Sequence, residues 1–187
     1  KFLNPNNNYI LNALDISENS LNGLMEYLKT QIAKIAEKKI ENIKSNYPQL
    51  IENNHIIETY VNDVLAIVNP VTDMKVAANS TMIFEAATEN PELKVSLLKQ
   101  IEKINPNKPW HFTNTSSIPI HLLNKQAELE GRIVGFHFYN PPAVQKLVEI
   151  ISADKTLKEL TEFATVYAKK LKKVVVYSND IAAFIGN

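Results

Sequence analysis

The chain has 187 residues, the length of one ordinary domain, and 45% of them are apolar against 21% charged. A buried core is therefore expected, and a disordered chain is not. Lys and Arg together number 20, as do Asp and Glu, so the basic excess that nucleic-acid or anionic-membrane partners usually require is absent.

The sequence lacks cysteine and long apolar runs, and this excludes further classes of protein. Without cysteine, disulfides and cysteine-ligated metal sites are excluded, which fits a cytoplasmic protein. No apolar run approaches the roughly 18 residues that cross a bilayer, and the opening KFLNPNNNYI has no signal-peptide core. We therefore expect no membrane span. No residues have metal-ligand spacing, so we expect no metal site either.

The predicted elements alternate between strands and helices along the chain. The strands are expected at residues 9–14, 64–68, 81–85, 111–113, 133–138, 146–151 and 174–177. The helices are expected from a cap at Ser17 or Ser20 to about Ala36, at 91–104 and at 156–172, with 40–63 irregular or helical. This alternation predicts an α/β fold with a mainly parallel sheet and helices on both faces.

Polar side chains gather where several predicted strands end, at Asp15, Glu85, residues 114–117 and residues 137–140. In open α/β sheets the ligand crevice lies at the carboxyl ends of the strands. An acid such as Asp15 can accept hydrogen bonds from the ribose hydroxyls of an adenine dinucleotide, or it can belong to the helix cap. The run NTSS at 114–117 can hold a substrate oxygen or a nicotinamide ribose, or it can be a simple turn.

His137 is the histidine with the most informative surroundings. Glu149 follows it by twelve positions, and the Asn-Pro-Pro turn between them can fold the second strand back beside the first. A neutral imidazole held by a carboxylate can take a proton from an alcohol, although a purely structural histidine is the alternative. For His55, His111 and His121 we expect no convergent acid, and we assign them structural or solvated positions.

A phosphate-binding glycine loop is missing from the expected place. The four glycines all come after Asp15, so no GxGxxG pattern precedes the predicted ribose-binding acid. Either the chain is not a dinucleotide binder, or it lacks the first strand and its loop; the start almost directly on a predicted second strand favours truncation. We therefore expect the isolated chain to bind NAD poorly.

The segments IFEA…ENPELK, NTSS, GFHFYNPP…KLVEII and DIAAFIGN occur in that order. Together they resemble the L-3-hydroxyacyl-CoA dehydrogenases, and the likeness runs from LDIS at 14–17 to Asn187. The resemblance implies that residues 1–187 are a Rossmann-like NAD-binding domain, with the family's C-terminal helical domain absent. The chain departs from the family at DIAAF, where Asp-x-Pro-Gly-Phe is usual.

The resemblance implies a catalytic role for five residues. His137 matches the catalytic base and Glu149 its carboxylate partner. Ser116 matches the residue that hydrogen-bonds the substrate's 3-oxygen and the cofactor. Asn140 matches an amide that positions His137 and the nicotinamide end, and Asn187 matches an active-site asparagine.

The resemblance also implies the residues that bind NAD. These are Asp15, Glu85, Lys94, Asn114, Ser116 and Asn140. Among them, Asp15 matches the acid on the adenosine ribose, whereas Glu85 and Lys94 match a nicotinamide-side glutamate and a lysine near the cofactor ribose.

The function implied is NAD-dependent oxidation of an L-3-hydroxyacyl-CoA thioester to the 3-oxoacyl-CoA, in fatty-acid β-oxidation or 3-hydroxybutyryl-CoA metabolism. The parent protein would be a homodimer, and this fragment alone is expected to be inactive. Two alternatives remain open at this stage. One is a non-catalytic remnant that serves as an interaction domain, and the other is a different β-hydroxyacid dehydrogenase that uses a lysine in place of the His137–Glu149 pair.

Overall fold

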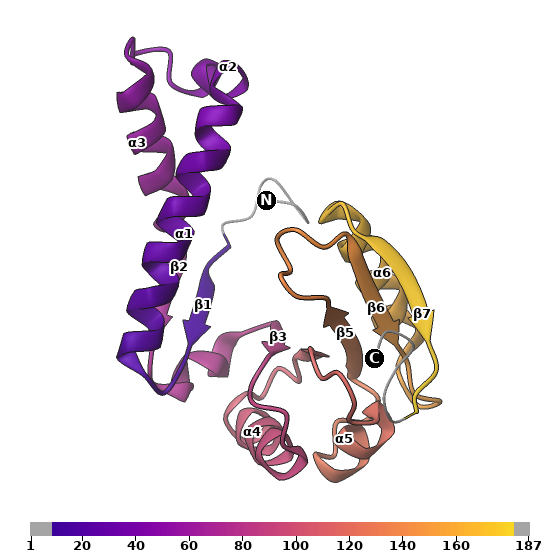
Figure 1. Ribbon diagram of the computed structural model, residues 1–187. Helices are drawn as coiled ribbons and strands as arrows, with labels where there is room; N and C mark the ends of the chain where they lie inside the picture. Colours follow the sequence, from indigo (N-terminus) through magenta and orange to yellow (C-terminus); the bar gives the residue numbers. More distant parts are fainter. Residues whose placement is uncertain (1–8, 182–187) are drawn as a thin grey trace. The chain divides into compact units, whose positions relative to one another are not determined.

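The computed structural model describes residues 9–181, and Figure 1 shows its elements along the chain. The chain divides between Val76 and Ala77 into two units, each with its own strands and its own apolar core. Among residues 9–181, no helix combines the length and the hydrophobicity that crossing a bilayer requires.

The first unit is a pair of strands joined by a helical hairpin. Its elements are β1 (Leu11–Leu14), α1 (Glu18–Lys38), α2 (Ile40–Ile43), the 3₁₀ helix η1 (Lys44–Asn46), α3 (Asn53–Leu65) and β2 (Val68–Val71). The strands are parallel, with Leu11 opposite Val68. Ser17 caps α1 by accepting a hydrogen bond from the Ser20 amide. Ala36, Ile43 and Ile56 form the buried core of the hairpin.

The predicted strand at residues 64–68 is wrong. Helix α3 continues to Leu65, and the strand begins only at Val68, where it pairs with β1. The run VLAIV at 64–68 is apolar throughout, and such a short run fits the end of a buried helix as well as a strand. The strand begins where pairing with β1 begins, and the sequence alone does not show this pairing.

The second unit is a five-stranded sheet covered by helices. Its elements are β3 (Met82–Glu85), α4 (Pro91–Ile104), β4 (Trp110–Thr113), α5 (Ile120–Gln126), β5 (Ile133–Phe138), β6 (Leu147–Ile151), α6 (Lys158–Lys170) and β7 (Val174–Ser178), and η2 (Met74–Asn79) spans the boundary between the units. The strand order is β3-β4-β5-β6-β7, and every neighbouring pair is parallel except β5 and β6. The mainly parallel sheet predicted from the sequence is confirmed.

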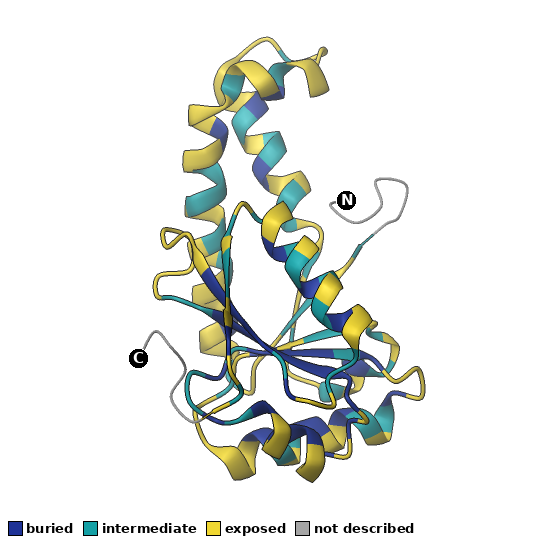
Figure 2. Cartoon of the chain, turned by 90° about the vertical axis from the view of Figure 1, so that its right-hand side faces the viewer, coloured by how far each residue is buried: buried dark blue, intermediate teal, exposed yellow. Residues whose placement is uncertain are grey.

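Helices cover both faces of this sheet, also as predicted. Alternation along β5 sends Ile133 to one face and Val134 to the other. Ile133 packs with residues of α4 and α5, such as Leu98 and Leu123, whereas Val134 packs against α6, for example on Leu160. Figure 2 shows the result, with buried central strands and helices whose outer sides are exposed.

Helix α5 lies in a stretch to which the sequence patterns assigned no element. It has seven residues, and its first two backbone N–H groups are satisfied from elsewhere in the chain. The Asp180 carboxylate accepts hydrogen bonds from the amides of Ile120 and His121. A helix this short is marginal by itself, so the contact with Asp180 and the burial of Ile120 and Leu123 stabilise it.

Candidate active site

The second unit has a cavity at the carboxyl ends of β3, β4 and β5. Parallel strands end at the same edge of a sheet, and this brings Glu85, Asn114 and His137 to one place. The cavity measures about 560 Å³, within the range of small-molecule sites. Its polar lining is Glu85, Glu89, Asn114, Ser116, His137, Tyr139 and Asn140, and its apolar lining is largely phenylalanine.

His137 and Glu149 lie directly opposite each other in the antiparallel pair of β5 and β6. Residues opposite each other in such a pair project to the same face, so the two side chains meet. His137 Nδ1 is 2.8 Å from Glu149 Oε2, with 7% of the histidine and 1% of the glutamate exposed. The side-by-side strands expected from the Asn-Pro-Pro turn are present, and so is the contact between the two side chains.

The Glu149 carboxylate is ionised despite its burial. Burial is the largest influence and by itself would raise the pKa of Glu149. Hydrogen bonds from His137, Ser178 and Tyr139 outweigh it and lower this pKa below its usual range. Burial, followed by the interaction with Glu149, raises the pKa of the Tyr139 phenol. A carboxylate that stays charged can orient an imidazole and balance its positive charge.

The polar run NTSS surrounds a carboxylate that sequence reasoning missed. Glu89 Oε1 accepts hydrogen bonds from Thr115 Oγ1 at 2.6 Å and from the amides of Ser116 and Ser117 at 2.9 and 3.0 Å. Burial would raise the pKa of Glu89, but these donors outweigh it and lower that pKa. The sequence did contain a signal for Glu89. It directly precedes Asn90, which caps α4, so it lies in the loop between the end of β3 and the start of α4.

Asn114 fixes the end of the strand that carries His137. Its side-chain oxygen accepts a hydrogen bond from the Phe138 amide at 2.8 Å, linking the loop after β4 to the end of β5. Asn140 lies three residues after His137, at the exposed rim of the cavity, and its peptide bond to Pro141 is cis. Asn114, Ser116, His137 and Asn140 therefore all line the same cavity.

Glu85 and Lys94 form a buried ion pair. Lys94 Nζ is 2.7 Å from Glu85 Oε1, with 1% and 0% of the two side chains exposed. Lys94 also donates to the Ala87 carbonyl, and Glu85 accepts from Thr113 Oγ1 at 2.6 Å and from the Ala87 amide. Glu85 lines the cavity, whereas the lysine head group is enclosed by these partners.

Two further predicted site residues are Asp15 and Asn187. Asp15 belongs to the first unit, where it is exposed at the end of β1 and accepts a hydrogen bond from the Ser17 amide at 2.8 Å. The capping side chain of α1 is Ser17 and not Asp15. Asn187 lies outside the described residues.

The expectation that His111 and His121 lack an acid partner is wrong. His121 Nδ1 is 2.8 Å from Asp180, and the fully buried His111 has its Nε2 2.8 Å from Glu102. Asp180 is 59 residues from His121, and Glu102 lies on α4, the helix before the strand of His111. A pattern along the sequence does not show that these acids contact the histidines. His55 is exposed, as expected.

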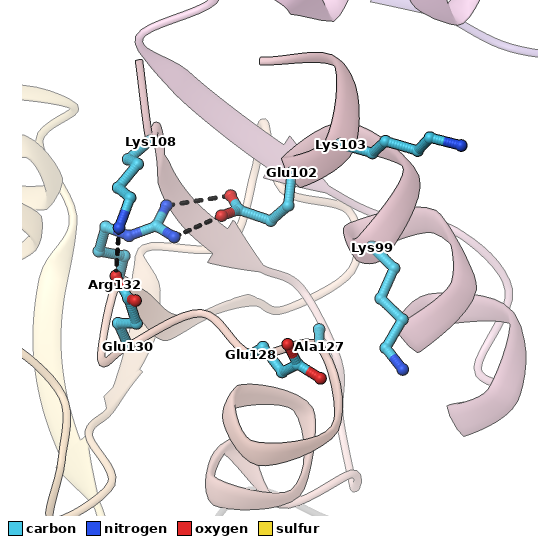
Figure 3. Close-up of a pocket in the computed structure, with 8 residues that line it drawn as sticks. All are labelled: Lys99, Glu102, Lys103, Lys108, Ala127, Glu128, Glu130 and Arg132. Carbon is cyan, nitrogen blue, oxygen red and sulfur yellow. Dashed lines mark hydrogen bonds and ion pairs between the residues drawn. The ribbon is translucent and has the colours of Figure 1, made fainter. Parts of the chain in front are cut away.

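A second cavity, of about 460 Å³, lies beside Glu102 and is lined by charges of both signs (Figure 3). Arg132 binds Glu102 with both terminal nitrogens, and Lys108 pairs with Glu130 at 2.7 Å. Burial opposes the ionisation of Glu102, but His111 and Arg132 lower its pKa to about 2. The ion pairs Arg132–Glu102 and Lys108–Glu130 join neighbouring segments of the lining, so we assign them to the stability of the unit. Among residues 9–181, no group of three histidines and acids could hold a metal ion.

Comparison with known proteins identifies what the chain is similar to. The family model described as "3-hydroxyacyl-CoA dehydrogenase, NAD binding domain" matches residues 7–181. A curated relative, the "Probable 3-hydroxybutyryl-CoA dehydrogenase" of Bacillus subtilis, is 30% identical over 152 residues, which are 81% of this chain and 53% of the relative. The chain thus spans about half the length of that relative.

Two solved structures show the same likeness. The (S)-3-hydroxybutyryl-CoA dehydrogenase of Ralstonia eutropha aligns with a TM-score of 0.78 and 26% identity, over 95% of this chain and 58% of the other. The 3-hydroxybutyryl-CoA dehydrogenase of Escherichia coli K12 aligns with a TM-score of 0.70 and 27% identity, over 90% of this chain and 33% of the other. These alignments agree with a Rossmann-like fold and with the mainly parallel, helix-covered sheet described for the second unit.

Proposed function

Because the chain belongs to the 3-hydroxyacyl-CoA dehydrogenase family as its NAD-binding domain, we propose that it takes part in the NAD-dependent interconversion of L-3-hydroxyacyl-CoA and 3-oxoacyl-CoA. The observation that carries this proposal is the contact of His137 with Glu149 beside a cavity at the carboxyl edge of the sheet. The pair is buried, ionised on the glutamate and placed where ligands bind in such folds.

His137 acts as the base in this proposal. Glu149 accepts a hydrogen bond from Nδ1–H, and this fixes the tautomer in which Nε2 carries the lone pair. His137 Nε2 then takes the proton of the substrate's 3-hydroxyl, and Glu149 balances the positive charge that develops on the ring. In the reverse direction the imidazolium returns the proton to the 3-oxygen. Ser116 and Asn140 hydrogen-bond that oxygen and orient it toward His137.

The residues of the cavity fit the nicotinamide end of NAD. Amide and hydroxyl groups at strand ends suit a ribose and a carboxamide, and the phenylalanine rings suit a flat heterocycle. NAD supplies the hydride acceptor when it is bound. We assign Asn114, Ser116 and Asn140 to its nicotinamide half, with Glu85 beside them and Lys94 as the counter-ion of Glu85.

The remaining assignments concern the two ends of the bound molecules. Asp15 would accept hydrogen bonds from the adenosine ribose, which favours NAD over NADP because a 2′-phosphate would be repelled by the carboxylate. Asn187 would supply a further amide to the active site. The substrate would be an acyl-CoA thioester, and the complete enzyme a homodimer. The relatives named as 3-hydroxybutyryl-CoA dehydrogenases make a four-carbon acyl group the first to test.

Activity with acetoacetyl-CoA and NADH, followed at 340 nm, tests the proposal in the full-length protein that contains this chain. We expect turnover with NADH and at least about tenfold lower kcat/KM with NADPH, since one repulsive contact of the 2′-phosphate is worth that factor. Free acetoacetate, which lacks the CoA thioester, is the matched control and should react poorly. If acetoacetyl-CoA is not reduced with either cofactor, the proposed function is wrong.

A further inference from the structure

The second oxygen of the Glu149 carboxylate has a partner that the proposed mechanism does not use. Ser178 Oγ donates a hydrogen bond to Glu149 Oε1 at 2.8 Å, while His137 is bound at Oε2. Ser178 is the last residue of β7, and only 8% of it is exposed. The carboxylate is therefore held from two strands, by β5 on one side and by β7 on the other.

The strand register explains how the serine reaches the carboxylate. Glu149 lies opposite Val176 in the parallel pair of β6 and β7. Ser178, two residues further, projects to the same face as Val176 and hence to the same face as Glu149. His137 reaches that face from the opposite neighbour, because it is the antiparallel partner of Glu149. The three side chains thus form a row across β5, β6 and β7.

The hydrogen bond from Ser178 limits how the Glu149 carboxylate can rotate. The terminal torsion of a glutamate is broad, so a carboxylate held at one oxygen can turn about its axis. Besides the hydrogen bond from Tyr139, the donor of Ser178 on Oε1 restricts that rotation and keeps the plane of the carboxylate such that Oε2 faces His137. Hydrogen bonds to an ionised group are stronger than those between neutral groups, which suits this restraint.

We propose that Ser178 is a positioning residue of the active site, which orients the imidazole of His137 by holding the Glu149 carboxylate. This inference rests on the proposed function for its kinetic consequence, but not for its structural one. A buried serine at a strand end commonly bonds to nearby backbone, whereas the contact seen for Ser178 is with a buried acid 29 residues away.

The test uses substitutions that change the hydroxyl separately from the volume. Ser178→Ala removes the donor, and the matched pair Ser178→Thr and Ser178→Val differs only in whether a hydroxyl is present. Ser152→Ala is the control, because Ser152 bonds the Thr161 hydroxyl at the end of β6 and not the dyad. If Ser178→Ala does not fold, Ser178→Val, which also lacks the hydroxyl, takes its place and is judged by the same outcomes.

The first measurement is ¹⁵N NMR of the histidine side chains in the full-length protein. We expect the wild type, Ser178→Thr and Ser152→Ala to show His137 as the single Nδ1–H tautomer, and Ser178→Ala and Ser178→Val to show a mixture of tautomers. An unchanged His137 signature in the variants that lack the hydroxyl overturns the proposal, whether or not the enzyme turns over acyl-CoA.

The second measurement is steady-state reduction of acetoacetyl-CoA. Loss of one hydrogen bond to a charged group is expected to lower kcat about tenfold in Ser178→Ala and Ser178→Val, with the KM for NADH unchanged and kcat restored in Ser178→Thr. Wild-type kcat in Ser178→Ala contradicts the inference. An inactive wild type contradicts the proposed function instead, and the NMR result then decides on Ser178 alone.

Discussion

Replacing Lys94 by methionine is expected to destabilise the second unit strongly. The Lys94 ammonium is 1% exposed and lies 2.7 Å from Glu85, whose side chain is fully buried. Removing one partner of a buried ion pair costs about 3–5 kcal/mol, because the other charge stays buried without compensation. Glu85 keeps hydrogen bonds from Thr113 and the Ala87 amide, so we expect the lower end, about 3 kcal/mol.

The single tryptophan makes this loss measurable in the second unit. Trp110 lies in β4, so its fluorescence during urea denaturation reports on the unfolding of that sheet. Lys99→Met, an exposed position on the same helix, is the matched control and should change stability by less than about 0.5 kcal/mol. Adding Glu85→Gln to Lys94→Met should recover part of the loss. Equal stability of the two lysine variants would show that the ion pair does not hold the site together.

Two further predictions concern the stability of the units. The Glu102 carboxylate has its pKa lowered to about 2 from an ordinary value of 4.5, so its stabilisation is present above pH 4.5 and lost as the pH falls toward 2. Arg132→Met should flatten this acid limb in denaturation curves recorded between pH 6 and 3, and an unchanged pH dependence would refute the origin given. Gly135→Ala should cost about 1–3 kcal/mol because its Cβ would lie 2.9 Å from Ile151 Cβ, whereas Gly23→Ala in α1 meets nothing within 4 Å and should add about 0.5–1 kcal/mol. Denaturation of both glycine variants, followed by circular dichroism, measures the two changes in the free energy of unfolding, which should have opposite signs. If Gly135→Ala leaves this free energy unchanged, the packing described at Ile151 is contradicted.

The fold was predictable where local patterns are strong. The α4 helix has a proline at its first turn and regularly spaced apolar residues, and its predicted limits agree with the structure. The boundary of β2 was not predictable, because an apolar run at 64–68 suits a helix and a strand equally. Helix α5 was missed because its stability depends on Asp180, about sixty residues further along the chain.

The candidate site also contains contacts that the sequence predicts and contacts that it does not. The meeting of His137 and Glu149 was predictable because one turn separates them, and the strand register then follows. The contacts of Glu89 with the NTSS run and of Ser178 with Glu149 join segments 26 to 29 residues apart, and they exist only once the sheet has formed. The same reason explains why the acid beside His111 was missed, since α4 must first pack against β4.

The most direct measurement compares turnover and NAD binding in His137→Ala and Glu149→Gln of the full-length protein. If His137 is the base and Glu149 orients it, kcat for acetoacetyl-CoA reduction falls by about 10²–10⁴-fold in both variants, while the Kd for NAD from calorimetry changes by less than about twofold. Wild-type turnover in both variants would contradict the roles given to these two side chains.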